Sequence, residues 1–301
     1  MLSQAIQDFI AVRRACGFQF KYQATFLHSF ASFAIGKGDQ YVRSSTAIEW
    51  AGLAHHTQQR AHRLGIVIRF VRYARIDDPR HGVPPPAFGH ENGPRKVPYI
   101  LTQDEVARLM QEAVRYGTHP MQGATYSTLI GLLACTGLRI SEALRLRYRD
   151  ITPDGLLIHN TKFRKSRLVA LHESARATLE RYLSQRRTFA PLGEHVFVSL
   201  RGTPLIQECV DGVFRELVRR VGLPRGPDLP RITPHSLRHT FAVRALQNCP
   251  AGRDRIARHM VALSTYLGHV DAAATYWYLQ ATPELMQGIA SCCERYVEDA
   301  S

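Results

Sequence analysis

Thr136-Gly137-Leu138-Arg139-Ile140-Ser141-Glu142 interrupts an apolar stretch and decides how the middle of the chain folds. Residues 127–135 before it have a helical, mostly apolar pattern, and Gly137 can take the left-handed conformation that ends a helix. The next helix is expected to start around Ser141. The heptapeptide therefore predicts two helices that meet at a glycine, with Arg139 in the break between them.

Helical patterns dominate the sequence on both sides of this break. Thr102-Gln103-Asp104-Glu105 has the residues of a capping box, and apolar residues follow it at helical spacing up to Gly117. After a turn at 151–155, two strand-like segments, 156–159 and 168–171, flank a basic tip. Further helical patterns cover residues 174–187, 207–221, 236–247, 254–267 and 283–297. We therefore expect a mainly α fold with a small antiparallel β-sheet, within the α+β class.

A segment rich in proline and glycine divides the chain. Residues 79–98 contain residues that interrupt helices and central strands, and we interpret 81–98 as a linker. Before it, residues 6–14, 24–35 and 57–75 show helical spacing. A chain of 301 residues is long enough for two cores. The predicted organisation is a helical domain over residues 1–80, the linker, and a second domain over residues 99–301.

The charge balance indicates a polyanionic partner. Lysine and arginine outnumber acidic residues 39 to 25, which gives a net charge of +14, and nucleic acid is the leading candidate. Apolar runs such as residues 129–135 are far shorter than the roughly 20 residues of a membrane-spanning helix. The first residues lack a secretory signal, so we expect a cytoplasmic protein. The six cysteines lack the spacing of a metal site or a disulfide framework.

Three further motifs follow the heptapeptide: His235-Ser236-Leu237-Arg238-His239, Leu267-Gly268-His269, and Tyr278. In order and separation, the four together resemble the successive motif boxes of the tyrosine recombinases, the phage integrase family. The resemblance extends from about residue 101 to the end, and it implies that residues 99–301 form the catalytic domain. Residues 1–80 resemble the family's core-type DNA-binding domain in size and placement. The ending from Ala281 to Met286 resembles that of recombinases encoded by mobile elements.

The motif residues suit attack on a phosphodiester, which places extra negative charge on the nonbridging oxygens. Arg139 and Arg238 can clamp such a phosphate because a guanidinium is permanently charged and forked. The resemblance makes Tyr278 the nucleophile of a 3′-phosphotyrosyl bond that leaves a 5′-hydroxyl. His235 and His269 would complete the clamp as hydrogen-bond donors, and His235 could also take the tyrosine proton. This chemistry requires no metal, ATP or other cofactor.

The family's general-acid lysine lies in a hairpin, and Lys162 in the basic tip at 160–165 matches it by position in the turn. Lys165 is the alternative. Charged residues near this tip and on the last helix of the first domain are candidate DNA contacts, although a solvated basic surface would have the same composition. These candidates are Arg60, Arg63, Arg164, Lys165 and Arg167.

Simpler interpretations exist for several of these residues. Tyr276 and Tyr266 lie near Tyr278, and aromatic clusters often serve packing, but only Tyr278 follows His269 by the nine residues typical of the family. His235 and His239 have the spacing of a metal-binding pair on a helix. No third ligand suggests itself, so we predict no metal site and interpret His239 as a structural residue. Arg139 could merely cap its helix or pair with Glu142.

These observations predict a site-specific recombinase that integrates, excises or transposes a mobile element. Its expected partners are double-stranded DNA and further copies of itself, as a tetramer on synapsed DNA, with no membrane partner. A topoisomerase of type IB and a noncatalytic architectural DNA-binding protein are the alternatives. The sequence identifies neither the target site nor the natural outcome of recombination.

Overall fold

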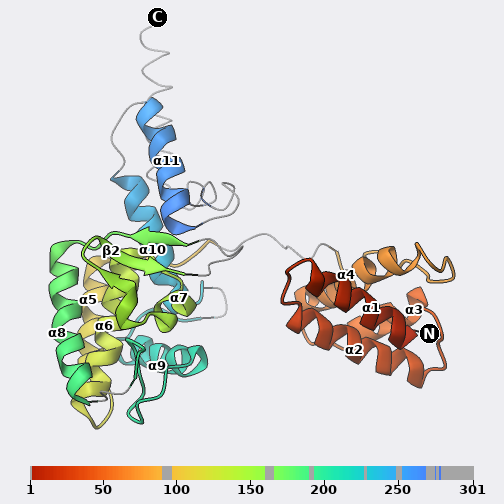
Figure 1. Cartoon of the computed structure of the whole chain (residues 1–301), viewed down its shortest axis with the longest axis horizontal. Coiled ribbons are helices and arrows are strands. Elements are labelled where there is room, and N and C mark those ends of the chain that lie inside the picture. The colour runs from red at the N-terminus through yellow and green to blue at the C-terminus, as the bar shows by residue number, and fades with distance from the viewer. Residues whose placement is uncertain are drawn as a thin grey trace, which may run out of the picture. The chain divides into compact units, whose positions relative to one another are not determined.

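The computed structural model describes residues 2–89, 97–159, 166–189, 193–226, 229–248 and 253–268, together with residues 275 and 278. The chain divides into two compact units, Met1–Arg95 and Lys96–Ser301. Their helices and strands are drawn in Figure 1. Within the described part of the chain, no helix is both long enough and apolar enough to span a membrane.

The first unit packs its described helices around one apolar core. They are α1 Leu2–Ala15, α2 Lys21–Gly36, α3 Ser44–Gly52 and α4 Thr57–Ala74. The helix α3 was not predicted, because its nine residues make a weak pattern. Its Trp50 is buried and contacts the ring of Phe30 at a centroid distance of 5.4 Å. Tertiary packing therefore stabilises a helix that would be marginal in isolation.

Residues 81–89 belong to the first unit, although the sequence placed the linker there. The buried His81 accepts a hydrogen bond from the Val42 amide at 3.2 Å, and the Gly82 amide bonds to the Val42 carbonyl at 2.8 Å. Val83 and Phe88 pack on the core of the unit.

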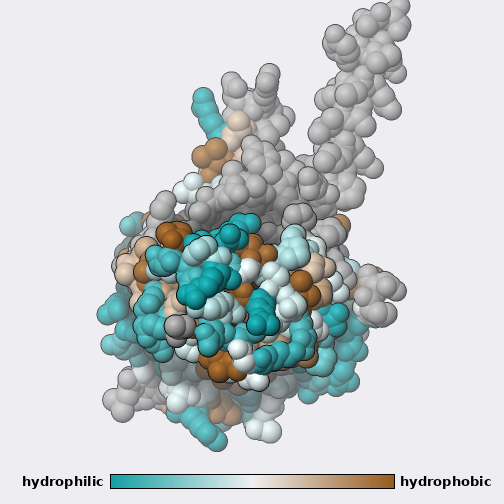
Figure 2. All heavy atoms as spheres, turned by 90° about the vertical axis from the view of Figure 1, so that its right-hand side faces the viewer, coloured by the Kyte–Doolittle hydropathy of each residue, from teal (hydrophilic) through white to brown (hydrophobic). Residues whose placement is uncertain are grey.

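On the face of the molecule in Figure 2, hydrophobic residues form separate spots among hydrophilic ones.

The second unit is organised around α6 Pro120–Thr136. This helix packs against α5 Gln103–Val114, α8 Glu173–Phe189 and α10 Pro234–Gln247. It begins earlier than predicted because Pro120 occupies its first turn and the His119 ring accepts a hydrogen bond from the Met121 amide. The capping box predicted for Thr102 and Glu105 is present at the start of α5.

A small sheet flanks these helices. Its strands are β1 Ile151–Thr152, β2 Gly155–Ile158 and β3 Arg167–Val169, paired antiparallel in that order. The predicted turn at 151–155 thus contains a short strand. The remaining elements are α7 Ile140–Arg145, the 3₁₀ helix η1 Tyr148–Asp150, α9 Gln207–Arg220 and α11 Arg253–Leu267. The predicted mainly α fold with a small antiparallel sheet is confirmed, while the helix predicted over 283–297 lies outside the described residues.

Candidate active site

Gly137 ends α6 and makes the break that the sequence predicted. Its φ of 61° lies in the left-handed region, and a Cβ there would lie 2.5 Å from the Phe241 ring. Glycine is therefore required both by the backbone conformation and by the close approach of a neighbouring helix. The chain then turns so that Arg139 precedes α7 in an extended conformation at the N-cap position.

Arg139 is held in place by Glu142. The Arg139 amide bonds to Glu142 Oε2 at 3.0 Å, and Nη1 of the guanidinium bonds to Oε1 at 2.9 Å. Nη2 of Arg139 donates to the carbonyl of Gly268 at 3.1 Å, which joins the α6–α7 break to the end of α11. The predicted alternative, that Arg139 pairs with Glu142, is thus observed. The arginine remains 29% exposed, which leaves its guanidinium accessible to a ligand.

Arg167 lies on the other side of Glu142. Its Nη1 and Nη2 bond to the two carboxylate oxygens at 3.1 and 2.8 Å, and its Nε donates to the Tyr266 carbonyl at 2.7 Å. Burial alone would raise the pKa of Glu142, but the bonds and charge of Arg167 and the bonds from Arg139 outweigh it and lower the pKa. Arg167 therefore orients Glu142, and its side chain is only 11% exposed. Whether Arg167 also contacts DNA stays a prediction.

Arg238 is the most deeply buried of the predicted clamp residues that the structure describes, with 1% exposure. Its Nη1 and Nη2 donate to the carbonyls of Gly137 and Leu267, both at 2.7 Å. Burial, followed by repulsion from Arg139, lowers its pKa to about 10. The side chain therefore remains positively charged at neutral pH, close enough to Arg139 for the two charges to interact.

His235 precedes Arg238 by about one turn of α10. Although the residue is exposed overall, desolvation of the imidazole by the protein around it, followed by the charges of Arg238 and Arg139, lowers its pKa to about 4. Both arginines disfavour a third positive charge beside them. His235 is therefore neutral at physiological pH and can accept a hydrogen bond or a proton.

Tyr278 is buried, with 3% exposure, and packs in a core cluster with residues of α10 and α11. Its hydroxyl lies 3.1 Å from Nδ1 of His239. This contact was not predicted, because the spacing of His239 from His235 indicated a structural residue. The sequence does place His239 directly after Arg238, and this position could have indicated that His239 lies beside the predicted phosphate clamp. His235 contacts His239 edge to face, with ring centroids 4.4 Å apart.

Several predicted residues fall outside the described part of the chain, namely Lys162, Arg164, Lys165 and His269. The described residues nearest to them end β2 at Ile158, begin β3 at Arg167 and end α11 at Leu267. The roles predicted for these four residues stay predictions. Among the side chains that the structure does describe, no group of three or more His, Cys, Asp or Glu residues could hold a metal ion.

The two candidate DNA contacts of the first unit are partly buried on α4. Arg60 donates from Nε to the carbonyl of Ala54 at 2.7 Å. The guanidinium of Arg63 lies 5.4 Å from the ring centroids of both Phe26 and Trp50. These contacts orient both side chains, and whether either side chain also meets DNA stays a prediction.

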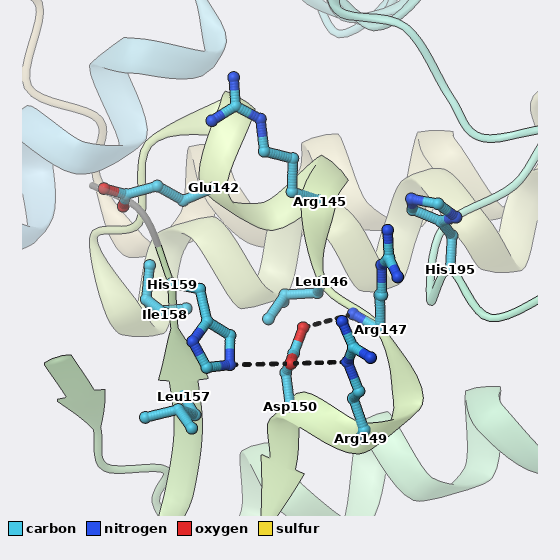
Figure 3. Close-up of a pocket in the computed structure, with 10 residues that line it drawn as sticks. All are labelled: Glu142, Arg145, Leu146, Arg147, Arg149, Asp150, Leu157, Ile158, His159 and His195. Atoms are coloured by element: carbon cyan, nitrogen blue, oxygen red, sulfur yellow. Dashed lines mark hydrogen bonds and ion pairs between the residues drawn. The ribbon is translucent and has the colours of Figure 1, made fainter. Parts of the chain in front are cut away.

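A basic pocket adjoins Glu142 in the second unit (Figure 3). It has a volume of about 710 Å³ and is lined by residues of α7, η1 and β2 and by residues that adjoin these elements, together with His195. Asp150 contacts His159 at 3.2 Å, and Arg147 pairs with Glu194 at 2.9 Å. Its basic lining residues are Arg145, Arg147, Arg149, His159 and His195. The pocket thus places further basic side chains beside Glu142, the residue that holds Arg139.

We predict that Glu142→Ala destabilises the second unit by about 3 kcal/mol, because it leaves Arg139 and Arg167 facing each other without their shared carboxylate. Urea unfolding monitored by circular dichroism measures this loss. Glu216→Ala on α9 is the matched control, since Glu216 pairs with two arginines at the surface and exposed pairs contribute little. Equal losses of unfolding free energy in the two variants would contradict the structural role of Glu142.

We also predict that His235 titrates with a pKa of about 4 in the free protein, and that this pKa rises when DNA binds, because a phosphate offsets the two arginine charges. NMR of the imidazole, assigned with His235→Gln, measures both values. Since the folded pKa lies below the unfolded value of about 6.5, protonation favours unfolding as pH falls through this interval. A free-protein pKa near 6.5 would contradict the described surroundings of His235.

The sequence model of the Phage integrase family matches residues 99–284. A candidate integrase/recombinase of Sinorhizobium fredii NGR234, y4rB, is 35% identical over 98% of this chain and 98% of its own length. The tyrosine recombinase XerD of Caulobacter vibrioides is 32% identical over 74% of this chain and 71% of its own length.

Solved structures with the same fold include recombinases bound to DNA. The Tn1549 transposon integrase in complex with circular intermediate DNA has a TM-score of 0.66 at 20% identity, covering 92% of this chain and 94% of that one. The XerH site-specific recombinase in a post-cleavage complex has a TM-score of 0.67 at 18% identity, and the match covers 90% of this chain and 79% of the XerH chain. At these identities the likeness supports the fold.

Proposed function

The chain belongs to the phage integrase family of tyrosine recombinases, and from this premise we propose that it cleaves DNA through a 3′-phosphotyrosyl bond to Tyr278. The family breaks and rejoins DNA at specific sites, so the predicted enzyme class is confirmed. The natural reaction we propose is the integration, excision or transposition of a mobile element. The ending at 281–286, with its resemblance to recombinases of mobile elements, supports that role.

One observation carries the proposal: two arginines, a neutral histidine and a buried tyrosine converge from distant parts of the chain. Arg139 precedes α7, and His235 and Arg238 lie on α10. The charges of Arg139 and Tyr278 both act on Arg238. A pair of cations beside a phenol is what attack on a phosphodiester requires, since charge develops on both the phosphate and the nucleophile.

In the proposed reaction, Arg139 and Arg238 bind the nonbridging oxygens of the scissile phosphate. The Tyr278 hydroxyl loses its proton to a neighbouring histidine while its oxygen bonds to phosphorus. The bond to the 5′ oxygen breaks, and that 5′ oxygen takes a proton from Lys162. A 5′-hydroxyl from another strand then reverses these steps and displaces the tyrosine. The phosphotyrosyl ester keeps the energy of the original bond, so rejoining needs no cofactor. His269 would add a further hydrogen bond to the phosphate.

We predict that Lys162→Ala slows cleavage by roughly 10²- to 10⁴-fold, the usual contribution of a general acid. A substrate with sulfur in place of the bridging 5′ oxygen should restore the rate, because a thiolate leaves without being protonated. Single-turnover cleavage of both substrates measures the effect. Lys165→Ala is the matched control, and rescue of that variant in place of Lys162→Ala would assign the role to Lys165.

Strand exchange distinguishes the proposal from a topoisomerase of type IB or a passive DNA-binding protein. Two duplexes of different length, each carrying DNA that borders the gene, are incubated with the protein. A recombinase produces joined strands of a new length. Relaxation of supercoiled DNA without exchange would indicate a topoisomerase, and binding without cleavage would indicate an architectural protein.

We further propose that the partner is duplex DNA and that the active assembly is a tetramer on two synapsed sites. Phosphate contacts would supply most of the affinity, which should fall as salt rises. The net charge of +14 supports this, as do the arginines of the pocket in Figure 3. A lambda integrase tetramer has been solved on a Holliday junction, which gives the fold a precedent for such an assembly. The reaction would take place in the cytoplasm, at the nucleoid.

A further inference from the structure

The hydroxyl of Tyr278 lies against His239, a residue that has no role in the reaction proposed above. Nδ1 of His239 is 3.1 Å from the phenolic oxygen, and the two rings have centroids 5.5 Å apart. Tyr278 is 3% exposed. A buried phenol cannot readily release its proton to bulk water, so a neighbouring group must take that proton before or during attack.

The surroundings of His239 suit that task. It directly follows Arg238 on α10, so the histidine and the arginine come from the same rigid helix. His235, the residue expected from the sequence to act as the base, lies one turn earlier and meets the His239 ring at an interplanar angle of 81°. The Tyr278 hydroxyl lies within hydrogen-bond distance of Nδ1 of His239. Geometry therefore favours His239 over His235 as the acceptor.

We propose that His239 is a catalytic residue of the cleavage reaction, and that its Nδ1 accepts the proton of Tyr278. This assignment rests on the proposed function of Tyr278 as nucleophile. In the free enzyme Nε2 carries the ring proton, and Nδ1 accepts a hydrogen bond from the phenol. As the oxygen–phosphorus bond forms, the phenolic O–H bond breaks and the proton passes to Nδ1. During rejoining, the same proton returns to the departing tyrosine oxygen.

Two substitutions separate proton transfer from simple positioning. His239→Ala removes the ring, whereas His239→Asn keeps a polar atom near the place of Nδ1 but cannot take a proton at neutral pH. If His239 is the base, both variants lose roughly 10²- to 10⁴-fold in single-turnover cleavage while DNA binding is retained. Imidazole added to His239→Ala should restore part of the rate. His172→Ala, at an exposed position before α8, is the matched control.

The substrate is a nicked duplex taken from the DNA that borders the gene, prepared with oxygen or sulfur at the bridging 5′ position. Sulfur should not rescue His239→Ala, because a better leaving group does not deprotonate the nucleophile. Wild-type rates in His239→Ala, full recovery in His239→Asn, or full rescue by sulfur would each overturn the assignment. If the wild type forms no adduct while binding the duplex, the proposed function itself fails, and the assignment fails with it. Thermal unfolding verifies that each variant is folded.

Discussion

Tyr278→Phe is expected to bind DNA as tightly as the wild type and to form no covalent adduct. Phenylalanine keeps the ring that packs in the core of α10 and α11, so the fold and the DNA surface should be preserved. Only the attacking oxygen is lost, and the effect on cleavage is therefore complete. The measurement is a denaturing gel of protein incubated with a nicked substrate whose cleaved strand diffuses away.

Tyr276→Phe is the matched control for this substitution, since it removes a neighbouring hydroxyl two residues earlier in the sequence. It is expected to form the adduct normally. An adduct that persists in Tyr278→Phe and disappears in Tyr276→Phe would transfer the nucleophilic role to Tyr276. Loss of the adduct in both variants would indicate that the aromatic segment acts through packing.

Arg238→Ala is expected to slow cleavage by roughly 10³-fold, the upper range for removing one preorganised donor from a developing negative charge. Arg238 is buried, and two of its N–H groups bond to backbone carbonyls at 2.7 Å. These bonds aim the guanidinium before substrate arrives, so no reorganisation is needed during the reaction. Single-turnover cleavage at saturating protein measures the loss separately from DNA binding.

The same carbonyl bonds give Arg238 a structural role that must be separated from catalysis. Arg238→Lys keeps a positive charge but lacks the planar fork that reaches Gly137 and Leu267 together. We expect it to fold, as judged by thermal unfolding, and to cleave nearly as slowly as Arg238→Ala. A lysine variant with the wild-type rate would show that charge alone suffices, which would contradict the clamp geometry.

The features predicted correctly were those set by local sequence. Gly137 marked the helix break because its conformation is a property of the residue itself, and Thr102 and Glu105 marked a helix start through a bond between near neighbours. The helix α3 was missed because its stability depends on contacts with α2 and α4, which no local pattern encodes.

Within the site, the sequence identified residue types better than their partners. Arg167 was predicted to meet DNA because it follows a basic tip, but its bond to Glu142, which lies 25 residues earlier in the chain, was not predicted. His239 was set aside because its spacing from His235 suggested only a helix face. Its contact with Tyr278 spans 39 residues of the chain, so no local pattern encodes it. Such long-range pairings come from the fold.

The most direct test of the account is to digest the wild-type protein–DNA adduct with a protease and locate the nucleotide-bearing peptide by mass spectrometry. We predict a phosphodiester between the 3′ end of the cleaved strand and the hydroxyl of Tyr278. A nucleotide attached to Tyr266, Tyr276 or any residue other than Tyr278 would contradict it, as would binding of the duplex by the wild type without any covalent product.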